Sequence, residues 1–378
     1  MIPDLNTGGA ERTTVDIAQA LVKSGGTALV VSEGGRLVDE LEAIGAAHIT
    51  LPVKSKNPLT IWKNAARLQK IIRTHKVDLI HARSRAPAWS CLIAARREKI
   101  PFVTTYHGFY SQKSAIKALY NSVMARADTV IANSHYTASQ IESRSPFAKG
   151  NITVIHRGSD ISKLAPASVT EDRRTALATA WGLKNTDRVL LNIARVTSWK
   201  GHSVIIDALA ELAQSGDTET IAILAGDAQG RAAYVEELKT RINANGLENR
   251  VRLVGHCDDV GAAMALADVS VVASIQPEAF GRAAVEAQAA CVPVIVSDLG
   301  AVPETVLAPP EVSDEERTGW RVPPGDPKAL ANAIREVFAM DTGERDELIK
   351  RAQAHATAHF SIEKMCAETL AVYDKLCS

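Results

Sequence analysis

Residues 188–202, RVLLNIARVTSWKGH, decide the fold class of this chain of 378 residues. The apolar run over 188–195 predicts a buried strand, and the polar stretch after it carries Lys200 a few residues beyond Arg195. Similar runs follow at TIAILAG (220–226), RVRLVGH (250–256), VSVVAS (269–274) and VPVIVSD (292–298). Strands of this kind are typical of a parallel sheet that is covered on both faces.

An earlier series of strands precedes this one. It comprises TALVVS (27–32), VDLIHA (77–82), PFVTTY (101–106), DTVIANS (128–134) and ITVIHRG (152–158). Helical patterns over 12–23, 59–74 and 116–125 alternate with these strands, which predicts a doubly wound sheet. Residues 160–187 contain no strand pattern and indicate a linker with a helix, and the chain is expected to be helical from Pro327. We therefore expect an α/β protein with two Rossmann-like domains.

The bulk composition excludes several classes of protein. With 46% hydrophobic and 23% charged residues, the chain is typical of a globular protein. No apolar run reaches the ~18 residues of a membrane span, and the first residues do not resemble a secretory signal. The five cysteines are scattered without CxxC spacing, which favours a reduced, cytoplasmic protein without structural zinc.

Charge is distributed unevenly although the net charge is zero. Residues 54–126 contain 15 Lys and Arg against Asp78 and Glu98 only, so this segment carries +13. It is either a solvated basic face or a surface attracted to an anionic partner, such as a cytoplasmic membrane leaflet or an acidic acceptor. Nucleic acid is disfavoured, because neither a nucleic-acid motif nor interleaved aromatic residues accompany the charge.

A glycine loop, NTGGAE (6–11), opens the first predicted helix. Gly8 and Gly9 would let backbone N–H groups approach an anion closely, although a turn that serves only the topology fits equally well. The loop lacks GxGxxG spacing, which counts against a dinucleotide cofactor. Only Met1–Leu5 precede it, so the first strand is either unusually short or begins upstream of this methionine.

Two further stretches place polar groups where strands end. Arg195 and Lys200 suit a diphosphate, since ligands of doubly wound sheets lie beyond the carboxyl ends of strands; a surface pair is the alternative. In PEAFGRAAVE (277–286) we expect a helix from about Phe280, with the Phe280 and Gly281 amides facing a phosphate. Glu278 would reach a sugar hydroxyl and Glu286 a ribose, unless they are a helix-stabilising acid and an exposed helical residue.

His107 ends another predicted strand, in TTYHGFY (104–110), and Gly108 follows it. A single histidine is more often a structural residue, but its place at a strand end favours a role in a site. The chain contains no D-x-D motif and no metal-ligand spacing, so no metal or other cofactor is expected.

Together these motifs resemble the retaining glycosyltransferases of family 4, which have the GT-B fold. The resemblance is carried by Glu278-x7-Glu286, Arg195…Lys200-Gly201, GGAE (8–11), His107-Gly108 and GWRVPPGDPKALANAI (319–334). It extends over essentially the whole chain. It implies two Rossmann-like domains that face a cleft, an acceptor-side domain over 1–165, a donor-binding domain over 166–359, and a C-terminal helix over 360–378 that packs back on the first.

The resemblance also implies a role for each site residue. Arg195 and Lys200 would bind the diphosphate of a nucleotide sugar, Glu278 its sugar and Glu286 its ribose. Gly8 and Gly9 would approach the diphosphate and sugar from the first domain, and His107 would lie at the reacting centre. The strand end at His256 would lie near the base, and the loop SDLGAVPE (297–304) near the donor.

Three residues depart from the family pattern. Arg282 stands where an aliphatic residue is commoner, Cys291 replaces a usual glycine, and Arg157 replaces an asparagine and could add an anion contact. The stretches HRGSDI (156–161) and PEAFGRAAVEAQA (277–289) resemble the corresponding sequences of bacterial lipopolysaccharide-core mannosyltransferases.

This resemblance leads to an expected reaction. We expect transfer of a hexose, with GDP-mannose as a candidate donor, to a glycan or glycolipid in lipopolysaccharide or exopolysaccharide synthesis. The enzyme would be cytoplasmic, with peripheral contact to the inner membrane through residues 54–126. The alternatives are a nucleotide-sugar 2-epimerase and a non-catalytic nucleotide-sugar binding protein.

Overall fold

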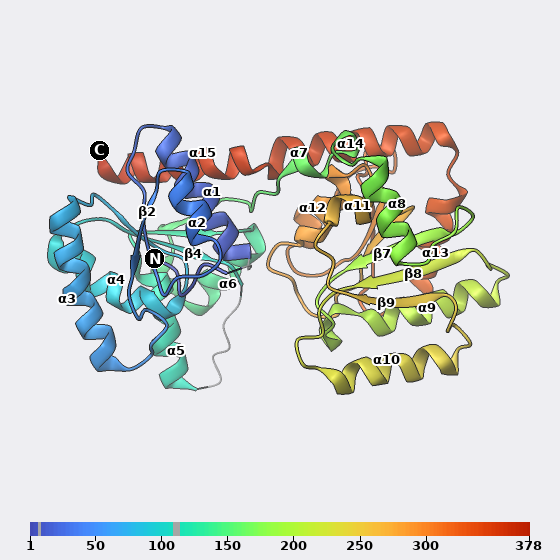
Figure 1. Ribbon diagram of the computed structural model, residues 1–378, viewed down its shortest axis with the longest axis horizontal. Coiled ribbons are helices and arrows are strands. Elements are labelled where there is room, and N and C mark those ends of the chain that lie inside the picture. Colours follow the sequence, from blue (N-terminus) through green and yellow to red (C-terminus); the bar gives the residue numbers. More distant parts are fainter. Residues whose placement is uncertain (7–8, 109–113) are drawn as a thin grey trace. The chain divides into compact units, whose positions relative to one another are not determined.

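A computed structural model describes residues 1–6, 9–108 and 114–378, which form two compact units. Unit 1 comprises Met1–Gly158 and Ile362–Ser378, and unit 2 comprises Ser159–Ser361. Each unit is an α/β domain with a parallel sheet, as the alternating strand and helix patterns predicted (Figure 1). None of the helices in these residues is both long enough and apolar enough to cross a membrane.

The assigned strands of unit 1 form a four-stranded sheet in the order β3-β4-β5-β6 and a pair β1-β2. Their bounds are β1 (Leu29–Ser32), β2 (Ala47–Thr50), β3 (Ile80–Ala82), β4 (Phe102–Tyr106), β5 (Thr129–Ala132) and β6 (Ile152–Val154). Every residue of β4 is buried, which explains its continuous apolar pattern. The strand β2 was not predicted, because its short sequence AHIT has no buried residue.

Residues 1–5 connect the two sheets of unit 1. On one side, the N–H of Ile2 donates to the carbonyl of Val31 in β1 at 3.2 Å. On the other side, the N–H of Arg83, the residue that follows β3, donates to the Met1 carbonyl at 2.9 Å. Pro3 has no N–H, so this segment does not continue as a regular strand. The chain runs from it to β1 and β2 on one side and returns to β3 on the other, which creates a topological switch point.

Helices cover the sheet of unit 1. They are α1 (Gly9–Lys23), α2 (Val38–Ala43), α3 (Pro58–His75), α4 (Arg85–Glu98), α5 (Ala115–Asn121), α6 (His135–Arg144) and α15 (Ile362–Cys377), with 3-10 turns η1 (Ser122–Arg126) and η2 (Pro146–Ala148). The predicted helices over 12–23 and 59–74 are α1 and α3. The predicted helix over 116–125 ends as α5 at Asn121, where a 3-10 turn follows. Ile17 of α1 and Met365 of α15 pack together over Val103 and Ile131 of the sheet.

Unit 2 contains a six-stranded parallel sheet in the order β12-β11-β10-β7-β8-β9. The strands are β7 (Arg188–Ile193), β8 (Thr220–Ala225), β9 (Val251–Gly255), β10 (Val269–Val272), β11 (Val294–Ser297) and β12 (Trp320–Val322). Leu190 packs into the core on one face of this sheet, and Val189 and Leu191 pack into the core on the other. The three-residue strand β12 escaped prediction because it is too short to show a pattern.

The helices of unit 2 begin with the segment that was expected to be a linker and a helix. They are α7 (Ile161–Leu164), α8 (Glu171–Ala180), α9 (His202–Gln214), α10 (Ala232–Ala244), α11 (Val260–Ala265), α12 (Arg282–Ala289), α13 (Pro327–Ala339) and α14 (Thr342–Phe360), with η3 (Pro166–Ser168), η4 (Ser198–Lys200) and η5 (Val302–Glu304). Cys291, which stands where the family has glycine, adopts a left-handed φ of +59° just after α12. Glycine reaches that conformation at lower cost, which accounts for the family preference.

Candidate functional site

The strand order of unit 2 places its switch point between β7 and β10. From β7 the chain adds β8 and β9 on one side, and then β10, β11 and β12 on the other. The loops after β7 and β10 therefore diverge and leave room for a ligand at the carboxyl ends of these strands. Lys200 lies in the loop after β7 and Glu278 in the loop after β10, so both lie at this edge.

Lys200 and Glu278 contact each other directly. Lys200 Nζ lies 2.6 Å from Glu278 Oε1, and the two side chains are only 15% and 12% exposed. Ser274, just after β10, donates a hydrogen bond from Oγ to the same carboxylate oxygen. An ammonium group has three N–H donors, and a carboxylate has two acceptor oxygens. Lys200 can therefore still donate to a phosphate while Glu278 Oε2 accepts from a hydroxyl.

Close backbone packing fixes these two loops. Gly201 has a φ of +73°, and a side chain there would overlap the carbonyl of Ala273. The N–H of Ile275 donates to the Trp199 carbonyl at 2.8 Å, so the loop after β7 is fastened to the end of β10. Gly201 therefore has two roles: it adopts the left-handed conformation of the turn, and it lets the loop after β7 pack against the Ala273 backbone.

The loop after β11 holds the backbone of Glu278. Ala301 N–H donates to the Glu278 carbonyl at 2.9 Å. Gly300 has a φ of +72°, and a Cβ atom there would lie 2.6 Å from the same carbonyl oxygen. The stretch SDLGAVPE, expected to lie near the donor, therefore positions the residue predicted to bind the sugar.

The expected start of the helix in PEAFGRAAVE was wrong by two residues. Helix α12 begins at Arg282, because Gly281 has a left-handed φ of +89° and forms its N-cap. The ring of Phe280 is buried and packs against Phe360, with ring centroids 5.6 Å apart. The predicted phosphate contacts of the Phe280 and Gly281 amides therefore belong to the turn before the helix.

Glu286 is buried rather than an exposed helical acid. Arg282 donates from Nε to Glu286 Oε1 at 2.6 Å, and the Glu286 side chain is 8% exposed. This contact gives a structural reason for the arginine that the family pattern did not explain. One carboxylate oxygen of Glu286 is held by Arg282, which leaves Oε2 to accept a further hydrogen bond.

Arg195 and His256 have more exposed positions in unit 2. Arg195 follows β7 with an exposed side chain, and no carboxylate of the described residues lies within ion-pair distance of it. His256 follows β9 and its Nε2 lies 3.1 Å from Asp258 Oδ1, with both side chains largely exposed. Both side chains are therefore accessible to a ligand at the carboxyl ends of the strands.

Unit 1 contributes His107 and the glycine loop. His107 follows β4, and its Nε2 is buried without a hydrogen-bond partner. Burial, with Arg83 and Arg157 nearby, holds its pKa well below the usual value, so the imidazole is neutral at pH 7. Gly9 begins α1, whereas Gly8 lies outside the described residues.

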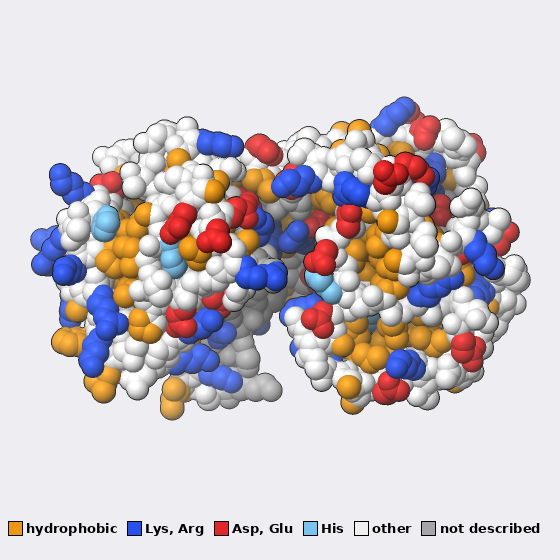
Figure 2. All heavy atoms as spheres, viewed as in Figure 1, with side chains coloured by type: hydrophobic (Ala, Val, Ile, Leu, Met, Phe, Trp, Pro, Cys, Tyr) orange, Lys and Arg blue, Asp and Glu red, His pale blue; other side chains and the backbone are white. Residues whose placement is uncertain are grey.

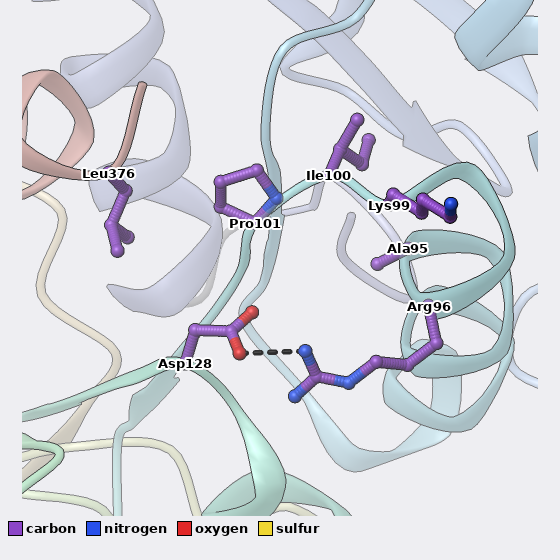
Figure 3. Close-up of a pocket in the computed structure, with 7 residues that line it drawn as sticks. All are labelled: Ala95, Arg96, Lys99, Ile100, Pro101, Asp128 and Leu376. Carbon is purple, nitrogen blue, oxygen red and sulfur yellow. Dashed lines mark hydrogen bonds and ion pairs between the residues drawn. The ribbon is translucent and has the colours of Figure 1, made fainter. Parts of the chain in front are cut away.

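A hollow on unit 1 lies away from these residues. Arg96 and Asp128 form an ion pair at 2.7 Å across it, and Pro101 and Leu376 line it (Figure 3). Pro101 precedes β4 and Asp128 precedes β5, so the hollow is at the amino ends of the strands. Ligand sites of open parallel sheets lie at the opposite ends, and this hollow is therefore a poor candidate.

Two contacts of the unit 2 site were missed in the sequence. Ser274 showed no signal, since only the fold brings it onto Glu278. The pair of Arg282 and Glu286 did have one, because residues four apart lie side by side on a helix.

Comparisons with known proteins cover both units. The sequence model of Glycosyltransferase Family 4 matches residues 7–163, and that of Glycosyl transferases group 1 matches residues 174–355. The crystal structure of a glycosyltransferase from Rickettsia africae ESF-5 is 31% identical, with a TM-score of 0.89 over 99% of this chain and 97% of that one.

Two further relatives carry names that describe ligands. Anabaena Alr3699/HepE, in complex with UDP and glucose, is 28% identical with a TM-score of 0.78 over 99% of each chain. The D-inositol 3-phosphate glycosyltransferase of Jonesia denitrificans is 28% identical over 315 residues, which are 79% of this chain and 72% of the relative.

Proposed function

The chain belongs to the family 4, group 1 glycosyltransferases with the GT-B fold, and on this premise we propose the reaction that its site performs. It moves a hexosyl group from a nucleotide-diphosphate sugar to a hydroxyl of a glycan or glycolipid, with retention of the anomeric configuration. The observation that carries the proposal is the largely buried contact of Lys200 with Glu278 at the switch point of unit 2.

The chemistry of this contact suits the departure of a diphosphate. As the bond from the sugar C1 to the phosphate oxygen breaks, negative charge develops on that oxygen. Lys200 and Arg195 supply positive charge where it develops, which lowers the barrier. Glu278 holds the ammonium of Lys200 in place and offers its second oxygen to a sugar hydroxyl, while Glu286 accepts from the ribose.

A front-face substitution accounts for retention. In this scheme the acceptor oxygen bonds to C1 on the face that the diphosphate leaves, and the hydroxyl proton moves to the departing phosphate oxygen. Glu278 is engaged with Lys200 and Ser274, which makes it a poor nucleophile for a covalent intermediate. Neutral His107 suits a hydrogen bond to an uncharged sugar, because it adds no charge beside the reacting centre.

Two donors deserve the first assays. UDP-glucose is supported by the ligands named for the Anabaena relative, and GDP-mannose by the sequence resemblance to mannosyltransferases. The acceptor is a glycan or lipid-linked sugar of lipopolysaccharide or exopolysaccharide synthesis.

An exposed surface of unit 1 supports an acceptor at a membrane. Trp62 of α3 and Ile116 of α5 are 57% and 82% exposed, and Lys63, Lys70 and Lys117 lie on the same two helices. Figure 2 shows blue Lys and Arg side chains gathered over the region that Figure 1 labels α3. Apolar side chains among cations suit the interface of an anionic leaflet, so we place the enzyme at the cytoplasmic membrane surface.

A transfer assay with each donor and a lipid-linked acceptor tests the function. Lys200→Ala should lose most turnover while the protein stays folded, and near-normal turnover would overturn the assignment. Incubation with donor alone separates the alternatives, since an epimerase converts the sugar without acceptor. A non-catalytic protein would bind the nucleotide and turn over nothing.

A further inference from the structure

A buried polar cavity lies within unit 1, at its own switch point. It is bounded by α1, by α15 and by the carboxyl ends of β3 to β6, and its volume is about 20 Å³. Its polar lining residues are Thr13, Arg83, Thr105, His107, Asn133, Arg157 and Thr369. The fold brings them together from six elements, and the sequence motifs single out only His107 and Arg157 among them.

Arg83 is the central charge of this cavity. It is 6% exposed and donates from Nη2 to Thr13 Oγ1 at 2.6 Å, while its Nε has no hydrogen-bond partner. No carboxylate of the described residues lies within ion-pair distance of Arg83, and Asp16 and Glu11 of α1 act on it only from farther away. Asp16 is already paired with Arg12. A buried guanidinium without a counter-charge is strongly unfavourable, which indicates that an anion compensates it.

Two neighbours show the same deficit. His107 Nε2 and Asn133 Oδ1 are also buried without a partner, and Asn133 is 4% exposed. The three residues that carry these unsatisfied atoms line one cavity, although buried polar groups are almost always hydrogen-bonded. An oxygen of a ligand in the cavity would accept from Arg83 Nε, and a proton or water on that ligand would donate to the asparagine oxygen. His107 Nε2 would donate or accept according to its tautomer.

A second cation lies at the start of a helix beside the cavity. The guanidinium of Arg157 is so close to Gly9 that a side chain at that position would overlap it. Gly9 begins the 15-residue helix α1, whose N-terminus carries partial positive charge. Arg157 and Arg83 both line the cavity, so two guanidinium groups and a helix N-terminus lie beside it.

From these observations we propose that unit 1 contains an oxyanion site formed by Arg83, Asn133 and Arg157. Its ligand is a phosphate or carboxylate group of the acceptor, an assignment that rests on the proposed function. The cavity has room for about one water molecule, since one water needs roughly 10–15 Å³. A single terminal oxygen therefore enters it, while the rest of the anionic group stays at the rim, where His107 and Arg157 are partly exposed.

The test measures anion binding without any transfer reaction. Inorganic phosphate is titrated at constant ionic strength against the melting temperature of the full chain, because ligand binding stabilises the folded state. Lys200→Ala serves as the background, because it removes one of the unit 2 groups expected to bind phosphate and so weakens that competing site. Arg83→Met in that background should raise the apparent dissociation constant for phosphate at least about tenfold. An unchanged constant would overturn the proposal.

A second variant covers the case in which Arg83→Met does not fold. Asn133→Asp has nearly the same shape and places a carboxylate against Arg83, so it should raise the melting temperature and abolish the response to phosphate. A retained response would contradict the site. A bromide soak gives an independent readout, with an anomalous peak expected beside Arg83; no peak there also counts against it.

The source of the anionic group is tested in the same background. Mannose 6-phosphate and mannose should differ if the site takes an acceptor phosphate, with stabilisation by the phosphate ester only. If nucleoside diphosphate competes with phosphate in Lys200→Ala, the site belongs to the donor instead, and the assignment to the acceptor is wrong. Phosphate binding together with absent transfer would overturn the proposed function and keep the oxyanion site.

Discussion

Removing either partner of the Lys200–Glu278 contact should destabilise unit 2 more than removing both. Each side chain is less than one-sixth exposed, and the two charged atoms lie 2.6 Å apart. Lys200→Met leaves a carboxylate with Ser274 as its remaining donor, and Glu278→Gln leaves a buried ammonium. Loss of one partner from a buried pair costs about 3–5 kcal/mol, whereas a neutral pair of similar volume is tolerated far better.

The geometry sets the expected magnitudes. With an effective dielectric constant of about 20, two charges at this separation attract by roughly 6 kcal/mol, most of which offsets their desolvation. A charged hydrogen bond retains about 1.5–3 kcal/mol. We therefore expect each single variant to lose about 3 kcal/mol, and the double variant to lose only about 1 kcal/mol, which is less than either single variant.

The assay is a double-mutant cycle followed by urea unfolding and by transfer rate. A loss of 3 kcal/mol corresponds to roughly 6–12 °C in melting temperature for a domain of this size. Lys239→Met is the control, because Lys239 and Glu236 form an exposed pair at 2.8 Å whose removal should cost less than about 0.5 kcal/mol. Losses that add to within about 0.3 kcal/mol would refute the coupling. Lys200→Met should also slow transfer by roughly 10²–10³-fold.

Three further predictions concern other residues. Gly201→Ala should lower the free energy of unfolding in urea by more than about 2 kcal/mol, since its side chain would overlap the Ala273 carbonyl. Gly216→Ala is the control, because Gly216 has a φ of +93° but open space around it, so its loss measures the cost of the backbone conformation alone. Equal losses in the two variants would contradict the overlap with Ala273. Burial lowers the pKa of His202 to about 4, so the unfolded state binds more protons below pH 6.5 and the free energy of unfolding should fall by about 2 kcal/mol between pH 7.5 and 5. In His202→Gln, the free energy of unfolding should fall by about 2 kcal/mol less over the same pH range. An unchanged dependence on pH would exclude His202 as its cause. Trp62→Glu should reduce the fraction of protein that sediments with anionic vesicles. Vesicle binding that depends neither on salt nor on Trp62 would contradict the proposed membrane-binding surface of unit 1.

Local pattern predicted the parts of the fold that are buried on both sides. The strand β8 is buried at all of its residues and shows as a continuous apolar run. The edge segments β2 and β12 and the Pro3-interrupted segment 1–5 lack such a run, because their pairing is determined by neighbours that are distant in sequence. Sequence patterns identify strands by their burial, and these segments are short, exposed or irregular.

The candidate site divides in the same way. Lys200 and Glu278 were predicted as ligands from their motifs, but their direct contact depends on the order of β7 and β10 in the sheet. Arg83 was counted among the cations of the basic segment, whereas the fold buries it beside Thr13. Charge counting treats every cation as exposed, so it cannot distinguish a membrane-facing lysine from a buried arginine.

The two switch points differ in how their cations are compensated. In unit 2, Glu278 already neutralises Lys200, so a donor must share the ammonium with the carboxylate, and its binding adds one further hydrogen bond to an existing pair. In unit 1, no described carboxylate lies within ion-pair distance of Arg83, so an anion that enters gains the full attraction of an uncompensated charge. Unit 2 is therefore preorganised without its ligand, whereas unit 1 should be stabilised markedly by one. Phosphate in a Lys200→Ala background should accordingly raise the melting temperature by more than the same phosphate does in an Arg83→Met background, and the reverse order would show that the charge imbalance of unit 1 is not relieved by ligand.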